Sequence, residues 1–198
     1  MNDHITQGIP STYSRIFSAT EASGFTMSSD MLTCSLLKTL AATKPSGSFL
    51  ELGTGTGLST AWILEGMDAS SKLISVDNDE KFLKVAADHL SHDTRLTLVM
   101  KDGGEWIKEN SSQKYDYIFA DTWPGKYFFL EETLALLNPG GLYIIDDMLP
   151  QANWPEGHDL KAKKLLEDLD VRMDLVLTRM AWASGIVVAV KKSDFAKS

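Results

Sequence analysis

The sequence contains a single cysteine, Cys34, among its 198 residues. A disulfide within the chain needs two cysteines and a cysteine zinc site needs more, so both are excluded. The absence of a disulfide framework fits a reducing, cytoplasmic setting. We expect Cys34, which lies in a helical pattern, to be a small core residue.

Long apolar runs, low-complexity segments and internal repeats are also missing. No run approaches the roughly 20 apolar residues that a membrane-spanning helix requires. The first eight residues have neither the basic end nor the apolar stretch of a signal peptide. We therefore expect no membrane insertion, no secretion and no solenoid or collagen-like architecture.

The sequence has fewer basic than acidic residues. The chain has 19 Lys and Arg against 27 Asp and Glu, a net charge of −8. Nucleic-acid-binding domains usually present a basic face, so nucleic acid is disfavoured as a partner. One cluster of lysines, Lys161, Lys163 and Lys164, is typical of a solvated helix face.

What the sequence does contain is a regular alternation of strand-like and helical segments. Short apolar runs begin at Ser48, Leu73, Leu96, Tyr115 and Gly141, and each is followed by a segment of helical period. Such alternation predicts an α/β fold with a doubly wound, mostly parallel sheet. With 43% hydrophobic residues, we expect residues 1–198 to form a single domain.

The helical segments carry recognisable ends. The stripe from Phe82 to Leu90 follows a cap at Asn78 or Asp79, and the stripe from Tyr127 to Leu137 is expected to stop at Pro139-Gly140-Gly141. A third stripe covers residues 162–169. Two strand-like runs, 172–178 and 185–191, then follow with no helix between them, which predicts an antiparallel hairpin that closes the sheet.

Residues 1–47 precede the first strand and are too few for an independent core. They carry one helical pattern at Tyr13, Ile16 and Phe17 and a second at Leu32, Leu36 and Leu40, behind the cap candidates Ser28 and Ser29. We expect an N-terminal helical flank or lid.

The sharpest motif is the run FLELGTGTG at residues 49–57, in which a strand enters a glycine loop and then a helix over 58–67. Its glycines are Gly53, Gly55 and Gly57. Glycines permit a tight turn and close approach to a ligand, and a helix N-terminus offers free N–H groups to an anion. The dinucleotide fingerprint needs its third glycine one residue later. A tight strand-to-helix turn without a ligand is the simpler alternative.

The residues around this loop suit S-adenosylmethionine. Glu51 would accept the ammonium of its methionine half, and Ser59 with the helix N-terminus would bind the carboxylate. Asp77 ends the second strand, 24 residues after Gly53, where an acid accepts hydrogen bonds from ribose hydroxyls. Asp102 and Gly103 follow the third strand, where the nucleobase would lie. Because the carboxyl ends of parallel strands meet at one edge, these groups should converge in one crevice.

The run ELGTGTG, the Asp that ends LISVD and the closing hairpin resemble class I S-adenosylmethionine-dependent methyltransferases over roughly residues 25–191. The motifs IFADTW and LYIIDDMLP are similar to the small O-methyltransferases related to catechol O-methyltransferase. The resemblance implies a Rossmann-like seven-stranded sheet in the order 3-2-1-4-5-7-6 with the last strand antiparallel. It also implies methyl transfer to an oxygen of a small aromatic or phenolic acceptor.

The resemblance also implies roles for particular residues. Asp121, Asp146 and Asp147 would bind a divalent cation such as Mg²⁺ that holds two oxygens of the acceptor. Asp121 and Trp123 would belong to the cofactor site, with Trp123 against the adenine. The segment Gly24 to Asp30, which contains Met27, would cover the methionine end. The simpler interpretation is that Asp146 and Asp147 only end a strand and cap a turn.

Two departures from the family pattern concern the chemistry. The animal catechol enzyme has its catalytic lysine one residue after the tryptophan, whereas this chain has Pro124 there and its nearest lysine is Lys126. The third metal ligand is typically Asn, and here it is Asp147. The candidates for a catalytic base are therefore Lys126 and His158. His158 ends a segment, 151–158, that would flank the acceptor pocket together with Trp154.

Two other functions stay open at this point. Bacterial relatives of this family include enzymes that methylate modified tRNA nucleosides, and a homodimer that pooled two Lys161 clusters would favour that activity. The loss of lysine at Pro124 is instead compatible with a cofactor-binding protein that has no catalytic activity.

Overall fold

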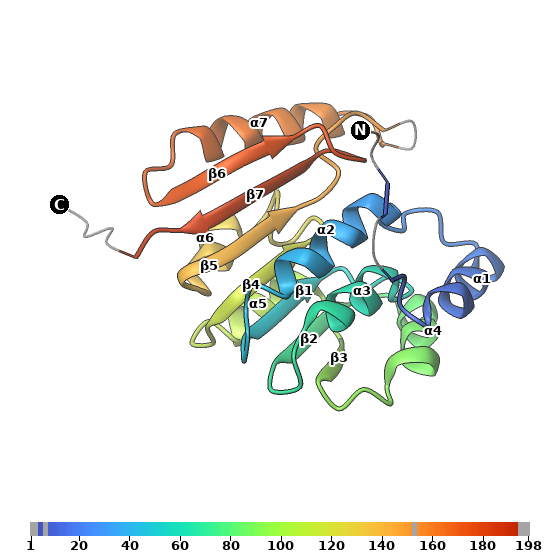
Figure 1. The fold of residues 1–198 in the computed structure, drawn as a ribbon. Helices are drawn as coiled ribbons and strands as arrows, with labels where there is room; N and C mark the ends of the chain where they lie inside the picture. The colour runs from blue at the N-terminus through green and yellow to red at the C-terminus, as the bar shows by residue number, and fades with distance from the viewer. Residues whose placement is uncertain (1–3, 6–7, 152–153, 194–198) are drawn as a thin grey trace.

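A seven-stranded sheet in the order β3-β2-β1-β4-β5-β7-β6 organises the computed structural model, which describes residues 4–5, 8–151 and 154–193 (Figure 1). The strands are β1 (Ser48–Leu52), β2 (Lys72–Asp77), β3 (Leu96–Met100), β4 (Tyr115–Ala120), β5 (Leu137–Ile145), β6 (Leu175–Met180) and β7 (Ile186–Lys191). Strands β1 to β5 pair in parallel, and β7 runs antiparallel to both β5 and β6. The predicted fold class, strand order and closing hairpin are confirmed.

Helices cover both faces of the sheet (Figure 1). On one face lie α1 (Tyr13–Ser23), α2 (Met31–Ala41), α3 (Leu58–Gly66) and α4 (Glu80–Leu90), and on the other α5 (Gly103–Glu109), α6 (Leu130–Ala135) and α7 (His158–Asp170). Successive strand residues alternate between these faces, so Phe49 enters the core under α1 to α4 and Leu50 the core under α5 to α7. No helix in the described ranges is long and apolar enough to cross a bilayer.

The N-terminal flank differs in detail from the prediction. The cap of α2 is Asp30, which accepts a hydrogen bond from the Leu32 N–H, and not Ser28 or Ser29. The buried stripe of α2 runs through Leu37 and Ala41, while the predicted Leu36 and Leu40 are only partly buried. Cys34 is buried as expected.

The predicted boundary between α6 and β5 is wrong. Helix α6 ends at Ala135 and β5 already begins at Leu137, because the Leu136 carbonyl accepts the Tyr115 N–H of β4 at 2.8 Å. Pro139 and Gly140 therefore lie inside an irregular strand, where the β4–β5 register shifts. The cap of α4 is Asp79, one of the two predicted candidates.

Some of the sequence evidence falls outside the described residues. The start of the chain, from which we expected no signal peptide, includes residues 1–3 and 6–7, and the segment after β5 includes residues 152–153. The organisation of residues 1–198 as a single domain stays a prediction.

Candidate functional site

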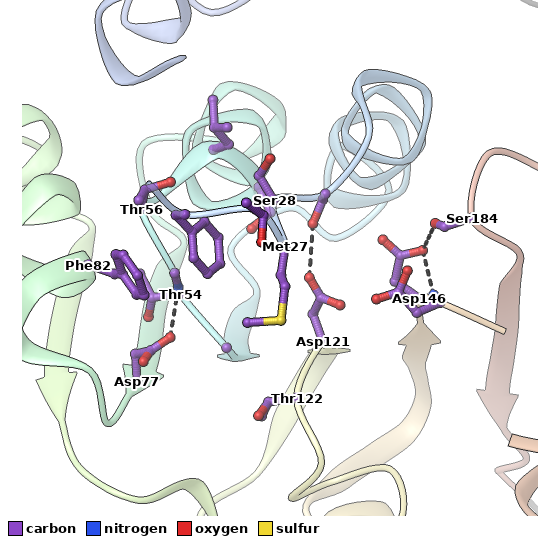
Figure 2. A pocket seen from close by; sticks show the side chains of 18 of the residues that line it. Met27, Ser28, Thr54, Thr56, Asp77, Phe82, Asp121, Thr122, Asp146 and Ser184 are labelled. Atoms are coloured by element: carbon purple, nitrogen blue, oxygen red, sulfur yellow. Dashed lines mark hydrogen bonds between the residues drawn. The ribbon is translucent and has the colours of Figure 1, made fainter. Parts of the chain in front are cut away.

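A cavity of about 800 Å³ opens at the carboxyl edge of the sheet (Figure 2). The register places the strand ends side by side, since Leu52 pairs with Ala120 and Ala120 pairs with Ile145. The residues that follow these strands therefore meet at the cavity. It brings together most of the predicted site residues: Gly53, Gly55, Ser59, Asp77, Asp121, Trp123, Lys126, Asp146, Asp147 and His158.

The glycine loop, residues 53–57, is fixed by the end of β2. One Asp77 carboxylate oxygen accepts the Gly55 N–H at 2.7 Å, and the other accepts the Asp79 N–H at 2.9 Å. Gly53 has φ of 101°, and a Cβ there would lie 2.9 Å from the Asp121 carbonyl oxygen. The loop thus needs glycine both for its backbone angle and for its contact with the end of β4.

The other two glycines of the loop have different surroundings. A Cβ on Gly55 would meet the Phe25 ring at 2.9 Å, inside the cavity wall. A Cβ on Gly57 would meet the Ala86 Cβ at 2.9 Å, and Gly57 does not line the cavity. Gly57 therefore allows the start of α3 to pack against α4, whereas Gly55 belongs to the cavity.

Glu51 lies behind the loop and not in the cavity lining. It points to the α3 face because it is two residues from Phe49 in the same strand. Its carboxylate is fully buried and accepts hydrogen bonds from Ser59 and Thr60 at 2.6 Å and from Ser75 at 2.5 Å. Burial raises the pKa of Glu51 to about 7 even against these hydrogen bonds.

A smaller cavity of about 50 Å³ adjoins the first and shares Gly53 and Asp77 with it. Asp102 and Gly103 line this second cavity, and Asp102 also caps α5 by accepting the Gly104 and Glu105 N–H groups. Trp123 lines only the first cavity, and its ring lies 5.9 Å from the His158 ring. Thr122 and Pro124, on either side of Trp123 in the sequence, line the second cavity together with Asp102.

The segment between α1 and α2 covers the glycine loop from above. Before this segment, Thr20 in the last turn of α1 donates to the Thr56 hydroxyl at 2.7 Å, and within it Ser29 donates to the Asp121 carboxylate at 3.0 Å. Figure 2 shows the Met27 side chain extending between the loop and Asp121. Met27 is 66% exposed, so its side chain is available to a molecule that enters the cavity.

Three aspartates, which we call the acid cluster, lie at the ends of β4 and β5: Asp121, Asp146 and Asp147. Asp146 is 2% exposed and accepts hydrogen bonds from the Ser184 hydroxyl and, at 2.7 Å, from the Asp147 N–H. Burial, followed by the charge of Asp146, raises the pKa of Asp121 well above its usual range. Burial also raises the pKa of Asp146 to about 6, with Asp147 adding to it.

Lys126 reaches this cluster although it lies five residues after Asp121 in the sequence. Its side chain is 3% exposed, lines the cavity and donates to the Asp146 carbonyl oxygen at 3.0 Å. Its positive charge lowers the pKa of both Asp121 and Asp146, opposing the effect of burial.

The sequence matches the methyltransferase domain family over residues 50–148, half of the chain. The chain belongs to this methyltransferase family. A curated relative from Mycolicibacterium vanbaalenii, named "Putative O-methyltransferase", is 29% identical over 115 residues, covering 56% of this chain and 51% of that protein. A similar relative from Mycobacterium avium is 29% identical over 110 residues. The chain spans about half the length of these relatives.

Solved structures extend the likeness to the whole fold. An O-methyltransferase from Bacillus cereus in complex with SAH has a TM-score of 0.81 at 18% identity, over 95% of this chain and 94% of that one. TomG, an O-methyltransferase from Streptomyces achromogenes in complex with SAM, has a TM-score of 0.80 at 17% identity, over 95% and 92%. The predicted resemblance to S-adenosylmethionine-dependent O-methyltransferases is confirmed, and the neighbours share the Rossmann-like methyltransferase fold.

The resemblance implies a metal site at the acid cluster. Within the described ranges no three His, Cys, Asp or Glu side chains are grouped so that they could hold a metal ion. One oxygen of Asp121 and one of Asp146 already accept hydrogen bonds from Ser29 and Ser184, and the Lys126 ammonium donates to the Asp146 backbone carbonyl. This donor set fits a divalent cation poorly, and the binding of one by Asp121, Asp146 and Asp147 stays a prediction.

His158, the other candidate base of this methyltransferase, begins α7 and is 7% exposed. Its Nε2 lies 2.9 Å from the Tyr127 hydroxyl, and the Trp154 ring packs on it at 4.4 Å between centroids. Its Nδ1 is buried, with no protein partner among the described residues. Burial, then the charge of Lys126, lowers the pKa of His158, which favours the neutral imidazole.

Sequence reasoning missed several residues that shape the methyltransferase site. Ser184 comes from the β6–β7 hairpin, Ser29 from the segment before α2 and Tyr127 from the loop after β4. Ser29 was predicted only as a helix cap and Tyr127 only as part of a helical stripe, and each of the three residues reaches the site through a contact with a residue distant in the sequence. Only the tertiary structure reveals their contacts.

Proposed function

We propose that this protein transfers the methyl group of S-adenosylmethionine to a hydroxyl oxygen of a small aromatic acceptor. One observation carries the proposal. A single cavity joins a glycine loop held by Asp77 to a pocket walled by Trp123, Trp154 and His158. The first part suits the cofactor and the second suits an aromatic ring.

The cofactor fits along the row of strand ends. Its methionine half would contact the loop at Gly53, Gly55 and Ser59, beneath Met27. Its ribose would hydrogen-bond to Asp77, and its adenine would extend toward the second cavity at Asp102 and Gly103. Glu51 and Gly57, predicted as direct contacts, would instead fix the shape of the loop from behind.

The reaction then needs alignment and removal of one proton. The acceptor oxygen attacks the methyl carbon, a new C–O bond forms, and the electron pair of the breaking C–S bond returns to sulfur. The hydroxyl proton passes to Nδ1 of the neutral His158 imidazole, the ring nitrogen without a protein partner among the described residues, since Nε2 is paired with the Tyr127 hydroxyl. Holding oxygen, carbon and sulfur in line supplies much of the rate.

The surface of α7 disfavours the tRNA alternative. Lys163 lies 3.9 Å from Glu167, Lys164 pairs with Asp168, and Lys161 lies over the Trp123 ring at 5.0 Å. These contacts leave little free positive charge for a phosphate backbone. A small-molecule acceptor therefore stays the better proposal, while a homodimer and a cytoplasmic location stay predictions.

Calorimetric titration with S-adenosylhomocysteine and with NAD tests the cofactor half of the proposal. We expect saturable one-to-one binding of S-adenosylhomocysteine and no heat of binding from NAD. Binding of NAD alone would contradict the proposed function, because the glycine loop would then serve a different nucleotide.

A further inference from the structure

We propose that the Lys126 ammonium is the resident cation of the acid cluster and holds the acceptor oxygen, so that this enzyme needs no divalent metal and accepts a ring with a single hydroxyl. The inference rests on the proposed function. It concerns which cation the site uses and which acceptors that cation permits.

A tight turn over residues 123–128 delivers Lys126 to the cluster. The Trp123 carbonyl accepts the N–H groups of Lys126 at 3.1 Å and Tyr127 at 2.9 Å, and the Gly125 N–H donates to the Phe128 carbonyl at 2.8 Å. Gly125 has φ of 90°, which favours glycine, and its carbonyl accepts the buried Tyr143 hydroxyl. The turn is thus fixed at both ends before the side chain begins.

This turn brings Lys126 to the acid cluster although the lysine lies two residues later than the resemblance would place it. The resemblance places a lysine directly after the tryptophan, where this chain has Pro124, and Lys126 follows two residues later. Pro124 itself turns to the second cavity, beside Gly103. The backbone then folds back through Gly125, and the Lys126 ammonium comes within hydrogen-bond distance of the Asp146 carbonyl.

The hydrogen-bond inventory at the cluster matches an ammonium better than a metal. Mg²⁺ needs several oxygen ligands in near-octahedral arrangement, and in the described part of the chain no three acidic, histidine or cysteine side chains are grouped to supply them, while one oxygen each of Asp121 and Asp146 is engaged by Ser29 and Ser184. An ammonium has three N–H donors, and one of them is directed at the Asp146 carbonyl. The remaining donors of a cavity-lining lysine can reach a ligand oxygen.

The cation at the acid cluster determines whether the site favours an acceptor with one hydroxyl or with two adjacent hydroxyls. A divalent metal can chelate two adjacent oxygens, which favours a catechol. A single ammonium holds one oxygen and orients it by hydrogen bonds, so a second hydroxyl brings no comparable advantage. We therefore expect a monohydroxy phenol to be methylated about as well as its 1,2-dihydroxy counterpart.

The experiment compares the wild-type protein, Lys126→Met, Lys126→Arg and the surface control Lys163→Met, which is 74% exposed at its side chain. Each is assayed with 4-ethylphenol and with 4-ethylcatechol, in chelator and in millimolar Mg²⁺. Thermal unfolding and the Kd for S-adenosylhomocysteine are measured in the same buffers. The thermal measurement needs no acceptor.

We expect the wild type to have the same Tm and the same turnover of 4-ethylphenol in chelator and in Mg²⁺. Lys126→Met should lower kcat/KM for the acceptor roughly a hundredfold, mainly through KM, and leave the cofactor Kd within about twofold. Lys126→Arg should recover part of the loss because it restores the charge. Lys163→Met should behave as the wild type.

Several results would overturn the inference. A wild-type Tm that rises saturably with Mg²⁺, or turnover that chelator abolishes, would show a metal in the place assigned to Lys126. An unchanged acceptor KM in a folded Lys126→Met variant would remove Lys126 from acceptor binding. If the wild type methylates neither phenol, the proposed acceptor class fails, and the Tm comparison still decides between Lys126 and a metal.

Discussion

Asp77 shows how one side chain can serve both the loop and a ligand. Its carboxylate accepts the Gly55 and Asp79 N–H groups and still lines both cavities. Carboxylate oxygens have about four lone-pair positions, so ribose hydroxyls can be accepted as well. The end of β2 thereby connects the shape of the glycine loop to the cofactor site.

We predict that Asp77→Ala weakens binding of S-adenosylhomocysteine by at least about 1.5 kcal/mol, because hydrogen bonds to a charged acceptor are lost. Calorimetric titration measures the change. Asp77→Asn, which keeps one oxygen for the Gly55 N–H, should lose less, and the exposed Asp88→Ala should lose nothing. An unchanged Kd in Asp77→Ala would remove Asp77 from the ribose site.

The burial of Glu51 predicts how the free energy of unfolding depends on pH. Its pKa rises from 4.5 to about 7 on folding, so the folded state favours its protonated form. This contribution is fully present below pH 4.5 and is lost as pH rises toward and through 7. Relative to Glu51→Gln, the wild type should therefore lose up to about 3 kcal/mol of unfolding free energy over that interval.

Urea unfolding of the wild type and Glu51→Gln, at several values between about pH 5 and pH 8, measures this difference. The remaining acids titrate in both proteins, so the gap between the two curves isolates Glu51. Parallel curves would mean that Glu51 is ionised in the folded protein throughout.

For single residues, the sequence predicted which side chains reach the cavity more accurately than it predicted what each of them does there. Asp77 and Asp121 were expected at the cavity because each directly follows a strand, and both lie there. Glu51 was expected to meet the ligand, but it lies inside β1, where side-chain alternation directs it beneath α3. Lys126 was a candidate base, and its contact with Asp146 depends on a turn that the sequence does not reveal.

Among the elements, the glycine loop allows a matched pair of variants. Gly55→Val places a branched side chain against Phe25 in the cavity wall, and Gly57→Val places one between α3 and α4. Both positions have positive φ, so each variant carries backbone strain. We expect Gly55→Val to abolish cofactor binding in a protein that remains folded, and Gly57→Val to lose more stability.

Circular dichroism with thermal unfolding separates the two effects, and calorimetry reports the binding. A Gly55→Val protein that binds normally would show that the loop does not approach the cofactor closely. Equal losses of Tm in the two variants would contradict the distinct roles assigned to the two glycines.

The start of α7 yields a prediction about pH and rate. Burial lowers the pKa of His158, with Lys126 and Lys161 acting in the same direction and Asp147 and Asp159 opposing them. The neutral base therefore persists below pH 6.5, and kcat should fall only at lower pH. His158→Gln should lose roughly a hundredfold in kcat together with this acidic limb.

The pH dependence of kcat in both proteins checks the assignment. Asp146 also titrates near pH 6, but it is retained in the variant, so the difference between the profiles reports on His158. An acidic limb that persists unchanged in His158→Gln would assign it to another group. The Kd for S-adenosylhomocysteine serves as the control and should stay constant.

Element boundaries were predictable where local chemistry determines them. Asp79 caps α4 through hydrogen bonds within one turn, so its role could be predicted from the sequence. The early start of β5 could not, because pairing between Leu136 and Tyr115 of β4 determines it. Ser28 and Ser29 were predicted as the cap of α2, but the cap is Asp30. The Ser29 hydroxyl instead donates to Asp121, which is distant in the sequence.

For the whole molecule, the alternation of strands and helices with short connections leaves few possible topologies, and the family resemblance selects one. The carboxyl ends then meet at one edge, and the cavity follows from this arrangement. The covering segment 25–30 and the Ser184 contact come from the two ends of the chain. The family resemblance implied the covering segment, whereas nothing in the sequence predicted the Ser184 contact, which joins residues far apart in the chain.

Transfer of a labelled methyl group tests the central claim most directly. The protein is incubated with S-adenosylmethionine carrying an isotopically labelled methyl group, in separate mixtures with 4-ethylphenol and with bulk tRNA, and mass spectrometry follows the label. We predict a labelled methyl ether of the phenol, formed together with S-adenosylhomocysteine and formed more slowly by Asp77→Ala at subsaturating S-adenosylmethionine. Label in the tRNA alone, or in neither acceptor while the cofactor binds, would contradict the account.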